Sequence, residues 1–150
     1  MILGIGVDTV EIGRFERQLE RTPKLVERLF VASERGLSGS SLAARFAAKE
    51  ALIKALGGSG ALAWHDMQVV RGVDRAPSFA PTAGLTRELR ARGGDRVHLS
   101  MTHDGGIATA FVVVEGTAVQ ASDASGAFGG VSASPSTLEP GQTASTEGAL

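Results

Sequence analysis

Cysteine is absent from the 150-residue chain, which excludes disulfide bonds, thiolate nucleophiles and cysteine-based zinc sites. No uninterrupted apolar run is long enough to span a bilayer. The first residues also lack the basic start of a signal peptide. We therefore expect a cytoplasmic protein that has no membrane partner.

Lys and Arg are missing from residues 116–150, where Ala, Ser, Gly, Thr and Pro predominate. Such a segment has few large apolar side chains, so it cannot bury enough surface to offset chain entropy. We predict one folded domain at residues 1–115 and a low-complexity, flexible tail at residues 116–150. Residues 1–115 hold all 15 basic residues and 13 of the 16 acidic ones, a balance too weak to indicate a nucleic-acid partner.

Hydrophobic periodicity predicts interleaved strands and helices within residues 1–115. The expected strands are 2–7, 66–71, 96–101 and 107–114, and the expected helices are 11–20, 23–29, 41–56 and 83–92. Asp104-Gly105-Gly106 has the chemistry of a hairpin turn, so we expect the last two strands to pair antiparallel. The pattern predicts an α+β fold in which helices pack on a small antiparallel sheet.

Three common motifs are excluded by their spacing. Gly4 and Gly6 do not begin a dinucleotide fingerprint, because Thr9 stands where the third glycine belongs. The glycines from Gly57 onward follow a predicted helix, whereas the glycines of a P-loop precede one, so their position favours helix termination. A serine hydrolase is disfavoured because the sequence has no G-x-S-x-G elbow.

Asp8 follows an apolar segment, at the position where the first strand is expected to end. Its carboxylate could cap a helix that begins near Val10, since Asp is a preferred N-cap residue. It could equally bind a hard cation, which prefers oxygen ligands. The residue by itself favours the cap and leaves both interpretations open.

The segment RFAAKEALIK at residues 45–54 combines cations and a carboxylate with small and apolar side chains. Helical spacing places Arg45 beside Lys49 and Glu50 beside Lys54. One interpretation is a solvated helix face with one ion pair. The other is a site for Mg²⁺ and phosphates, because Mg²⁺ takes one or two protein carboxylates and completes its shell with phosphate and water. Spacing does not decide between them.

His103 stands at the end of an expected strand, directly before a turn. It is either an exposed turn residue or a group that binds phosphate or transfers a proton. A basic stripe precedes it in the chain and follows helical spacing until Pro23 interrupts it. Its members are Arg14, Arg17, Arg21, Lys24 and Arg28. This stripe is either ordinary solvated surface or a docking surface for an acidic partner helix.

Three segments, in this order, resemble the holo-acyl-carrier-protein synthase family, the small trimeric class of phosphopantetheinyl transferases. They are IGVDTVEI at residues 5–12, RFAAKEALIKALG at residues 45–57 and SMTH at residues 100–103. The resemblance covers about residues 2–115. It weakens between Glu34 and Arg45, where the family usually has a longer segment, and at the turn of residues 74–77, which keeps only Pro77.

The resemblance implies the phosphopantetheinyl transferase fold and an enzyme of fatty acid biosynthesis. Such an enzyme moves 4′-phosphopantetheine from coenzyme A to a serine of apo-acyl carrier protein and releases 3′,5′-ADP. It implies a homotrimer with active sites at subunit interfaces. Asp8 and Glu50 would bind Mg²⁺ and act with Lys54 in catalysis. The implied coenzyme A contacts are Arg45, Lys54, Gly57 and His103, and the implied carrier-docking residues are Arg14, Arg17 and Arg21.

Two alternatives accompany this interpretation. The chain could serve the carrier domains of a polyketide or other megasynthase, with the tail at residues 116–150 as a former linker. It could instead be a non-catalytic module of the same fold that binds coenzyme A or a carrier protein. The presence of Asp8, Glu50 and Lys54 argues against the second alternative, because a binding module has less need of a metal site.

Overall fold

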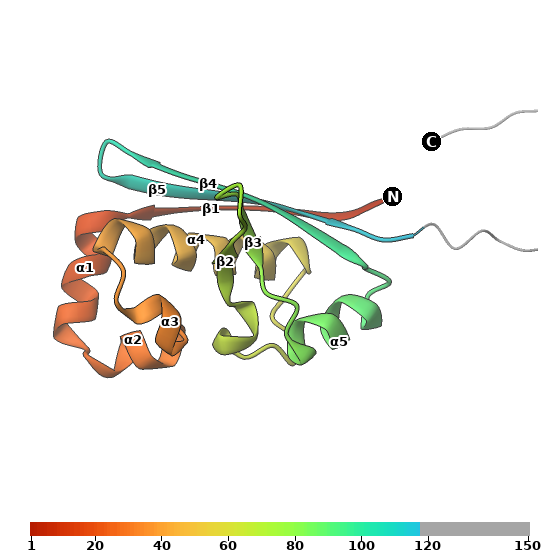
Figure 1. Cartoon of the computed structure of the whole chain (residues 1–150), viewed down its shortest axis with the longest axis horizontal. Helices are drawn as coiled ribbons and strands as arrows, with labels where there is room; N and C mark the ends of the chain where they lie inside the picture. The colour runs from red at the N-terminus through yellow and green to blue at the C-terminus, as the bar shows by residue number, and fades with distance from the viewer. Residues whose placement is uncertain (118–150) are drawn as a thin grey trace, which may run out of the picture. The chain divides into compact units, whose positions relative to one another are not determined.

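The computed structural model of this chain describes residues 1–117, shown in colour in Figure 1. The tail predicted at residues 116–150 lies outside the described residues from position 118 onward and stays a prediction. In chain order the elements are β1 (Ile2–Glu11), α1 (Ile12–Arg21), α2 (Lys24–Leu29), α3 (Ala32–Arg35), α4 (Gly39–Ala55), the 3₁₀ helix η1 (Trp64–Met67), β2 (Val69–Arg71), β3 (Pro77–Phe79), α5 (Ala83–Ala91), β4 (Arg96–Asp104) and β5 (Ile107–Glu115). Over the described residues, no helix is both long and apolar enough to cross a membrane.

The main sheet has three antiparallel strands in the order β1-β5-β4, and β2 pairs with β3 in a separate hairpin. The helices lie on one side of the three-stranded sheet (Figure 1). Central strand β5 turns Ala108, Ala110, Val112 and Val114 toward them, and all four are buried. This alternation is the pattern of a sheet with one covered face. The predicted α+β class and the antiparallel β4–β5 pair are confirmed.

Helix α4 packs directly on β1 and β5. Its contact surface is rich in alanine, which lets helix and strand backbones come close. Gly4 and Gly6 of β1 are part of the same fit, because a Cβ atom on either would clash with the carbonyl oxygen of Ala55 or Ala51. The two glycines therefore serve helix packing, which explains their spacing without a nucleotide.

Strand β1 continues four residues beyond its predicted end. Asp8 remains within the strand and pairs with Ala110 of β5. The cap of α1 is Glu11, whose side chain accepts hydrogen bonds from the backbone N–H groups of Gly13 (3.1 Å) and Arg14 (2.6 Å). The interpretation of Asp8 as a cap for a helix near Val10 is therefore wrong, because Glu11 caps that helix and the Asp8 carboxylate does not.

The remaining differences are local. Ser38, rather than Ser40 or Ser41, caps α4 through a 3.3 Å bond from the Ser41 N–H group. The strand expected at residues 66–71 divides into η1 and β2, and α3 and β3 were not predicted. These elements have three or four residues each, too few for a periodic signal. The helices expected at 11–20 and 83–92 are confirmed to within a residue at each end.

Candidate active site

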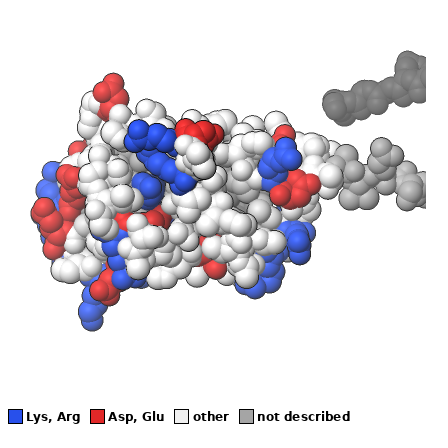
Figure 2. Space-filling view, viewed as in Figure 1, with Lys and Arg blue, Asp and Glu red and all other residues white. Residues whose placement is uncertain are grey.

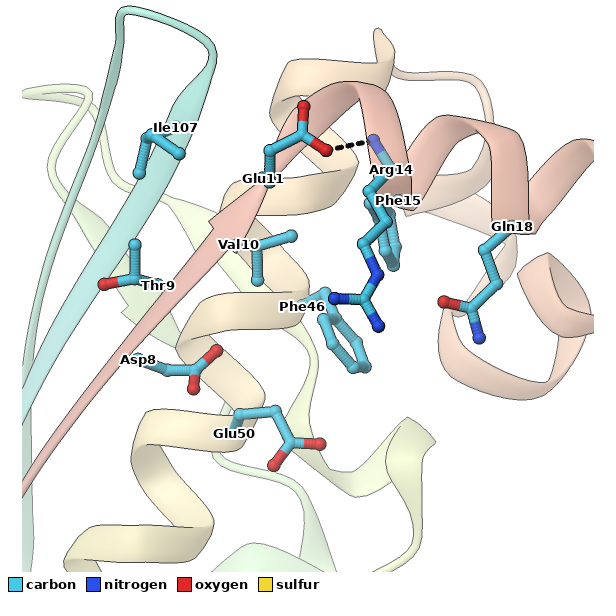
Figure 3. Close-up of a pocket in the computed structure, with 10 residues that line it drawn as sticks. All are labelled: Asp8, Thr9, Val10, Glu11, Arg14, Phe15, Gln18, Phe46, Glu50 and Ile107. Carbon is cyan, nitrogen blue, oxygen red and sulfur yellow. Dashed lines mark hydrogen bonds between the residues drawn. The ribbon is translucent and has the colours of Figure 1, made fainter.

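Asp8 and Glu50 line the same cavity, which has a volume of about 510 Å³. Asp8 belongs to β1 and is paired with buried Ala110, so its side chain projects from the sheet face that α4 covers. Glu50 projects from α4 toward the same space. Figure 3 shows the two carboxylates extending into this space, with Arg14 and Gln18 of α1 across from them.

Burial raises the pKa of Glu50 above its usual value, and the negative charge of Asp8 raises it further, while Lys54 opposes both. The two carboxylates therefore repel one another across a partly desolvated space, and a divalent cation between them would relieve the repulsion. Within residues 1–117, no cluster of three or more His, Asp or Glu side chains could hold a metal. Two hard oxygen donors beside open space fit Mg²⁺, which keeps positions for phosphate and water.

Lys54 forms an ion pair with Asp8. Its Nζ atom lies 2.7 Å from Asp8 Oδ1 and donates a second hydrogen bond of 3.1 Å to the carbonyl oxygen of Val7. The Glu50–Lys54 pair that a plain helix face would have formed is absent from the described residues. The Lys54 side chain is 52% exposed, so it has room to move toward a bound anion.

Helix α1 brings basic side chains to the edge of the carboxylate cavity. Arg14 lines this cavity and also a neighbouring hollow of about 310 Å³. The other residues of that hollow are Arg17, Gln18, Arg21 and Thr22. Arg17 also lies 3.7 Å from Glu11 across an exposed ion pair. The stripe breaks where predicted, because α1 ends at Arg21 and α2 begins at Lys24.

A second cavity, the cationic cavity, lies on the side of α4 opposite Glu50 and has a volume of about 220 Å³. Arg45 and His103 line it, together with Arg71 of β2. Arg45 and Glu50 are five residues apart, which separates them by about 140° around the helix axis. The structure therefore does not bring Arg45 and His103 into the cavity of Asp8 and Glu50 within one chain. Figure 2 shows basic side chains gathered beside the β2–β3 hairpin on this face.

Arg71 is a candidate that the sequence interpretation missed. It ends the strand predicted at residues 66–71, and a basic residue at a strand end is the same kind of signal that drew attention to His103. The positive charge of Arg71 helps lower the pKa of Arg45, although burial is the larger cause and Glu34 opposes both. Two arginines that face one cavity in this way favour an anionic ligand.

Gly57 lies at the C-terminal end of α4. Its φ of +72° is in the left-handed region, and its N–H group donates to the carbonyl oxygen of Lys54 (3.0 Å). This geometry is a helix-terminating turn. Gly57 belongs to neither the carboxylate cavity nor the cationic cavity among the described residues.

Comparison with known proteins identifies the family of the chain. The sequence matches the 4′-phosphopantetheinyl transferase superfamily over residues 4–111. A holo-[acyl-carrier-protein] synthase from Clavibacter sepedonicus is 61% identical over 116 residues, which are 77% of this chain and 98% of that protein.

Solved structures show the same fold. The crystal structure of holo-[acyl-carrier-protein] synthase from Neisseria meningitidis superposes with a TM-score of 0.71 at 33% identity, over 77% of this chain and 99% of the other. The Helicobacter pylori enzyme, solved in complex with coenzyme A, gives a TM-score of 0.66 at 34% identity, over 74% and 99% of the two chains. The chain therefore belongs to the holo-[acyl-carrier-protein] synthase family of 4′-phosphopantetheinyl transferases.

Proposed function

We propose that this chain transfers 4′-phosphopantetheine from coenzyme A to a serine of apo-acyl carrier protein in a Mg²⁺-dependent reaction. The observation that carries the proposal is that Asp8, which is ion-paired with Lys54, and Glu50 line one cavity with a basic edge. The high identity to holo-[acyl-carrier-protein] synthases along nearly their whole length supports the same activity.

Asp8 and Glu50 would hold Mg²⁺. When bound there, the ion would offset the negative charge of the coenzyme A pyrophosphate. Lys54 would leave Asp8 and contact a phosphate oxygen, where its charge stabilises the negative charge that grows during transfer. The half-exposed position of its side chain supports this movement.

The nucleophile comes from the carrier protein. Its serine hydroxyl would give up its proton, to Glu50 or to water, and form the new bond to the β-phosphorus, while the bond to 3′,5′-ADP breaks and the bonding electrons leave with that product. The chain needs no nucleophile of its own, which is consistent with its lack of cysteine. The basic surface of Arg14, Arg17 and Arg21 would dock an acidic helix of the carrier beside the carboxylate cavity.

The cavity of Arg45, Arg71 and His103 would bind the 3′-phosphate at the nucleotide end of coenzyme A. Because α4 separates it from Asp8 and Glu50 in one chain, the two cavities are best combined across a subunit boundary. We propose that the enzyme is a homotrimer with three such shared clefts.

The outer face of the main sheet supports assembly. It presents exposed large apolar side chains, which in a monomer would form an unusual contiguous apolar surface. They are Leu3, Ile5, Val7, Ile107 and Phe111. Ile5 pairs with Val113 and Val7 with Phe111 in the β1–β5 register, so these side chains lie next to one another on that face.

Mass spectrometry of the carrier tests the proposal. The chain is incubated with apo-acyl carrier protein, coenzyme A and Mg²⁺, and the carrier mass is followed with and without EDTA. We expect a gain of one phosphopantetheine that EDTA abolishes. An unchanged carrier mass under every metal condition would refute the transferase function and would favour a module that only binds.

A further inference from the structure

Glu34 is an almost fully buried acid that the proposed reaction does not use. It lies on the short helix α3, and its side chain is 2% exposed. Buried carboxylates are rare unless they are paired and hydrogen-bonded. The surroundings of Glu34 therefore indicate what it does.

The two oxygens of Glu34 join three elements. Oε2 accepts hydrogen bonds from Lys49 Nζ of α4 (3.0 Å) and from the Val31 N–H group (3.2 Å). Oε1 accepts from the N–H group of Val69 in β2 (3.1 Å) and lies 3.7 Å from Arg45 Nε. Only three residues separate α3 from α4, so this carboxylate is held close to the first turns of α4.

Lys49 has several partners besides Glu34. It is completely buried, and its ammonium group also donates to the carbonyl oxygens of Leu29 (2.7 Å) and Trp64 (3.3 Å). It lies 4.8 Å from the centre of the Phe30 ring. Lys49 therefore stabilises the protein core, and its position does not depend on Glu34 alone.

Arg45 depends on Glu34 much more. The Nε atom of Arg45 is buried and has no hydrogen-bond partner among the described residues. Among the same residues, Arg45 forms one ion pair, the 3.7 Å contact of this atom with Glu34. The guanidinium also donates to the carbonyl oxygen of Ser41 (3.3 Å). Without Glu34, nearby Lys49 and Arg71 would both repel Arg45.

We propose that Glu34 is a positioning residue for coenzyme A: it fixes Arg45 and, through Val69, the strand that carries Arg71, so that both arginines face one cavity. The inference rests on the proposed function, because it takes the cavity of Arg45, Arg71 and His103 as the site for a coenzyme A phosphate. The carboxylate acts through the two arginines and does not touch the ligand.

The test separates positioning from stability. Glu34→Gln removes the charge at nearly constant size and leaves Lys49 as a buried cation without its acid, so this variant will lose stability. The double variant Glu34→Gln with Lys49→Met removes both buried charges and should regain much of the melting temperature. Glu88→Gln is the matched control, because Glu88 pairs with Arg92 (2.6 Å) outside both cavities.

Calorimetric titration with coenzyme A, well below each melting temperature, gives the decisive readout. We expect the dissociation constant to rise about ten- to a hundredfold in both Glu34 variants, since a displaced binding group costs that much. The KM for coenzyme A should rise in parallel while kcat at saturation changes less than about threefold. Glu88→Gln should match the original chain.

A double variant that regains its melting temperature and binds coenzyme A like the original chain would overturn the inference and leave only a structural role for Glu34. Loss of kcat with an unchanged KM would overturn it as well. If the original chain itself neither binds coenzyme A nor modifies the carrier, the proposed function fails, and this inference fails with it.

Discussion

Lys54 Nζ lies 2.7 Å from Asp8 Oδ1 and ties the end of α4 to the middle of β1. The carboxylate proposed to bind Mg²⁺ thus already has a cation of the chain as its partner. Under the proposed assignment, Mg²⁺ would compete with Lys54 for Asp8, and the phosphates of coenzyme A would give Lys54 another partner.

Lys54→Met removes the competing cation, so binding of a divalent ion without coenzyme A should become tighter. Transfer should fall about 10²- to 10³-fold, the usual cost of losing one group that stabilises the transition state. Mn²⁺ titration followed by electron paramagnetic resonance measures the first effect, and the carrier mass measures the second. Lys54→Arg keeps the charge and is the control. Metal affinity that is unchanged or weaker in Lys54→Met would contradict the competition.

Glu50→Gln should raise the melting temperature of the metal-free protein at neutral pH. Burial and Asp8 raise the pKa of Glu50 in the folded state, so the folded protein binds this proton more tightly than the unfolded chain does. That stabilisation is fully present below the ordinary pKa of 4.5 and is lost as the pH rises through the higher folded value.

The gain in melting temperature from Glu50→Gln should therefore be largest at neutral pH and vanish as the pH falls below 4.5. Thermal scans from pH 4 to 8 in EDTA check it, and saturating Mg²⁺ should reduce the difference, because the ion stabilises only the carboxylate form. A gain that does not change with pH would show that burial and Asp8 do not raise the pKa of Glu50 in the folded protein.

Arg71→Ala should weaken the binding of coenzyme A more than the binding of 3′-dephospho-coenzyme A, because only coenzyme A has the phosphate that Arg71 would contact. The affinity for coenzyme A should fall about tenfold, which is what the loss of one charge-assisted hydrogen bond costs. Titration calorimetry with both ligands measures the difference. Arg75→Ala, in the turn that joins β2 to β3, is the control. Equal losses for the two ligands would show that Arg71 does not bind that phosphate.

Phe111→Glu should dissociate the proposed trimer, because it places a charge on the apolar outer face of the sheet. Transfer should be lost with assembly if the cleft is shared. Light scattering coupled to size exclusion measures the mass, and Val73→Glu, which changes a fully exposed valine in the β2–β3 turn, is the control. A stable monomer with full activity would refute shared clefts.

The long elements were predictable because burial of one face gives a periodic pattern. Helix α1 and the β4–β5 hairpin follow from the spacing of apolar residues and from Gly105 and Gly106. The end of β1 was misjudged, although Thr9 and Val10 are β-branched residues that favour a strand. A continued strand places Asp8 opposite α4, which a helix cap would not have done.

Tertiary contacts decided what spacing could not. Helical spacing predicts that Arg45 and Lys49 share one side of α4 while Glu50 and Lys54 share another. It cannot predict that Lys54 pairs with Asp8, which is 46 residues away. It also gives no sign that Glu34 joins Lys49 to Val69, since an acid in a short polar segment usually lies in solvent.

Asp8 and Glu50 are the proposed metal ligands, and the transfer assay with Asp8→Asn and Glu50→Gln tests this assignment most directly. Both variants keep the size of the side chain but remove a charge that would hold Mg²⁺. Glu11→Gln is the matched control, because Glu11 lines the same cavity but caps α1. We predict that each of the first two variants remains folded and oligomeric while its carrier gains no phosphopantetheine, whereas the control transfers normally. Full transfer by Asp8→Asn and Glu50→Gln would contradict the assignment of this cavity as the metal-dependent active site.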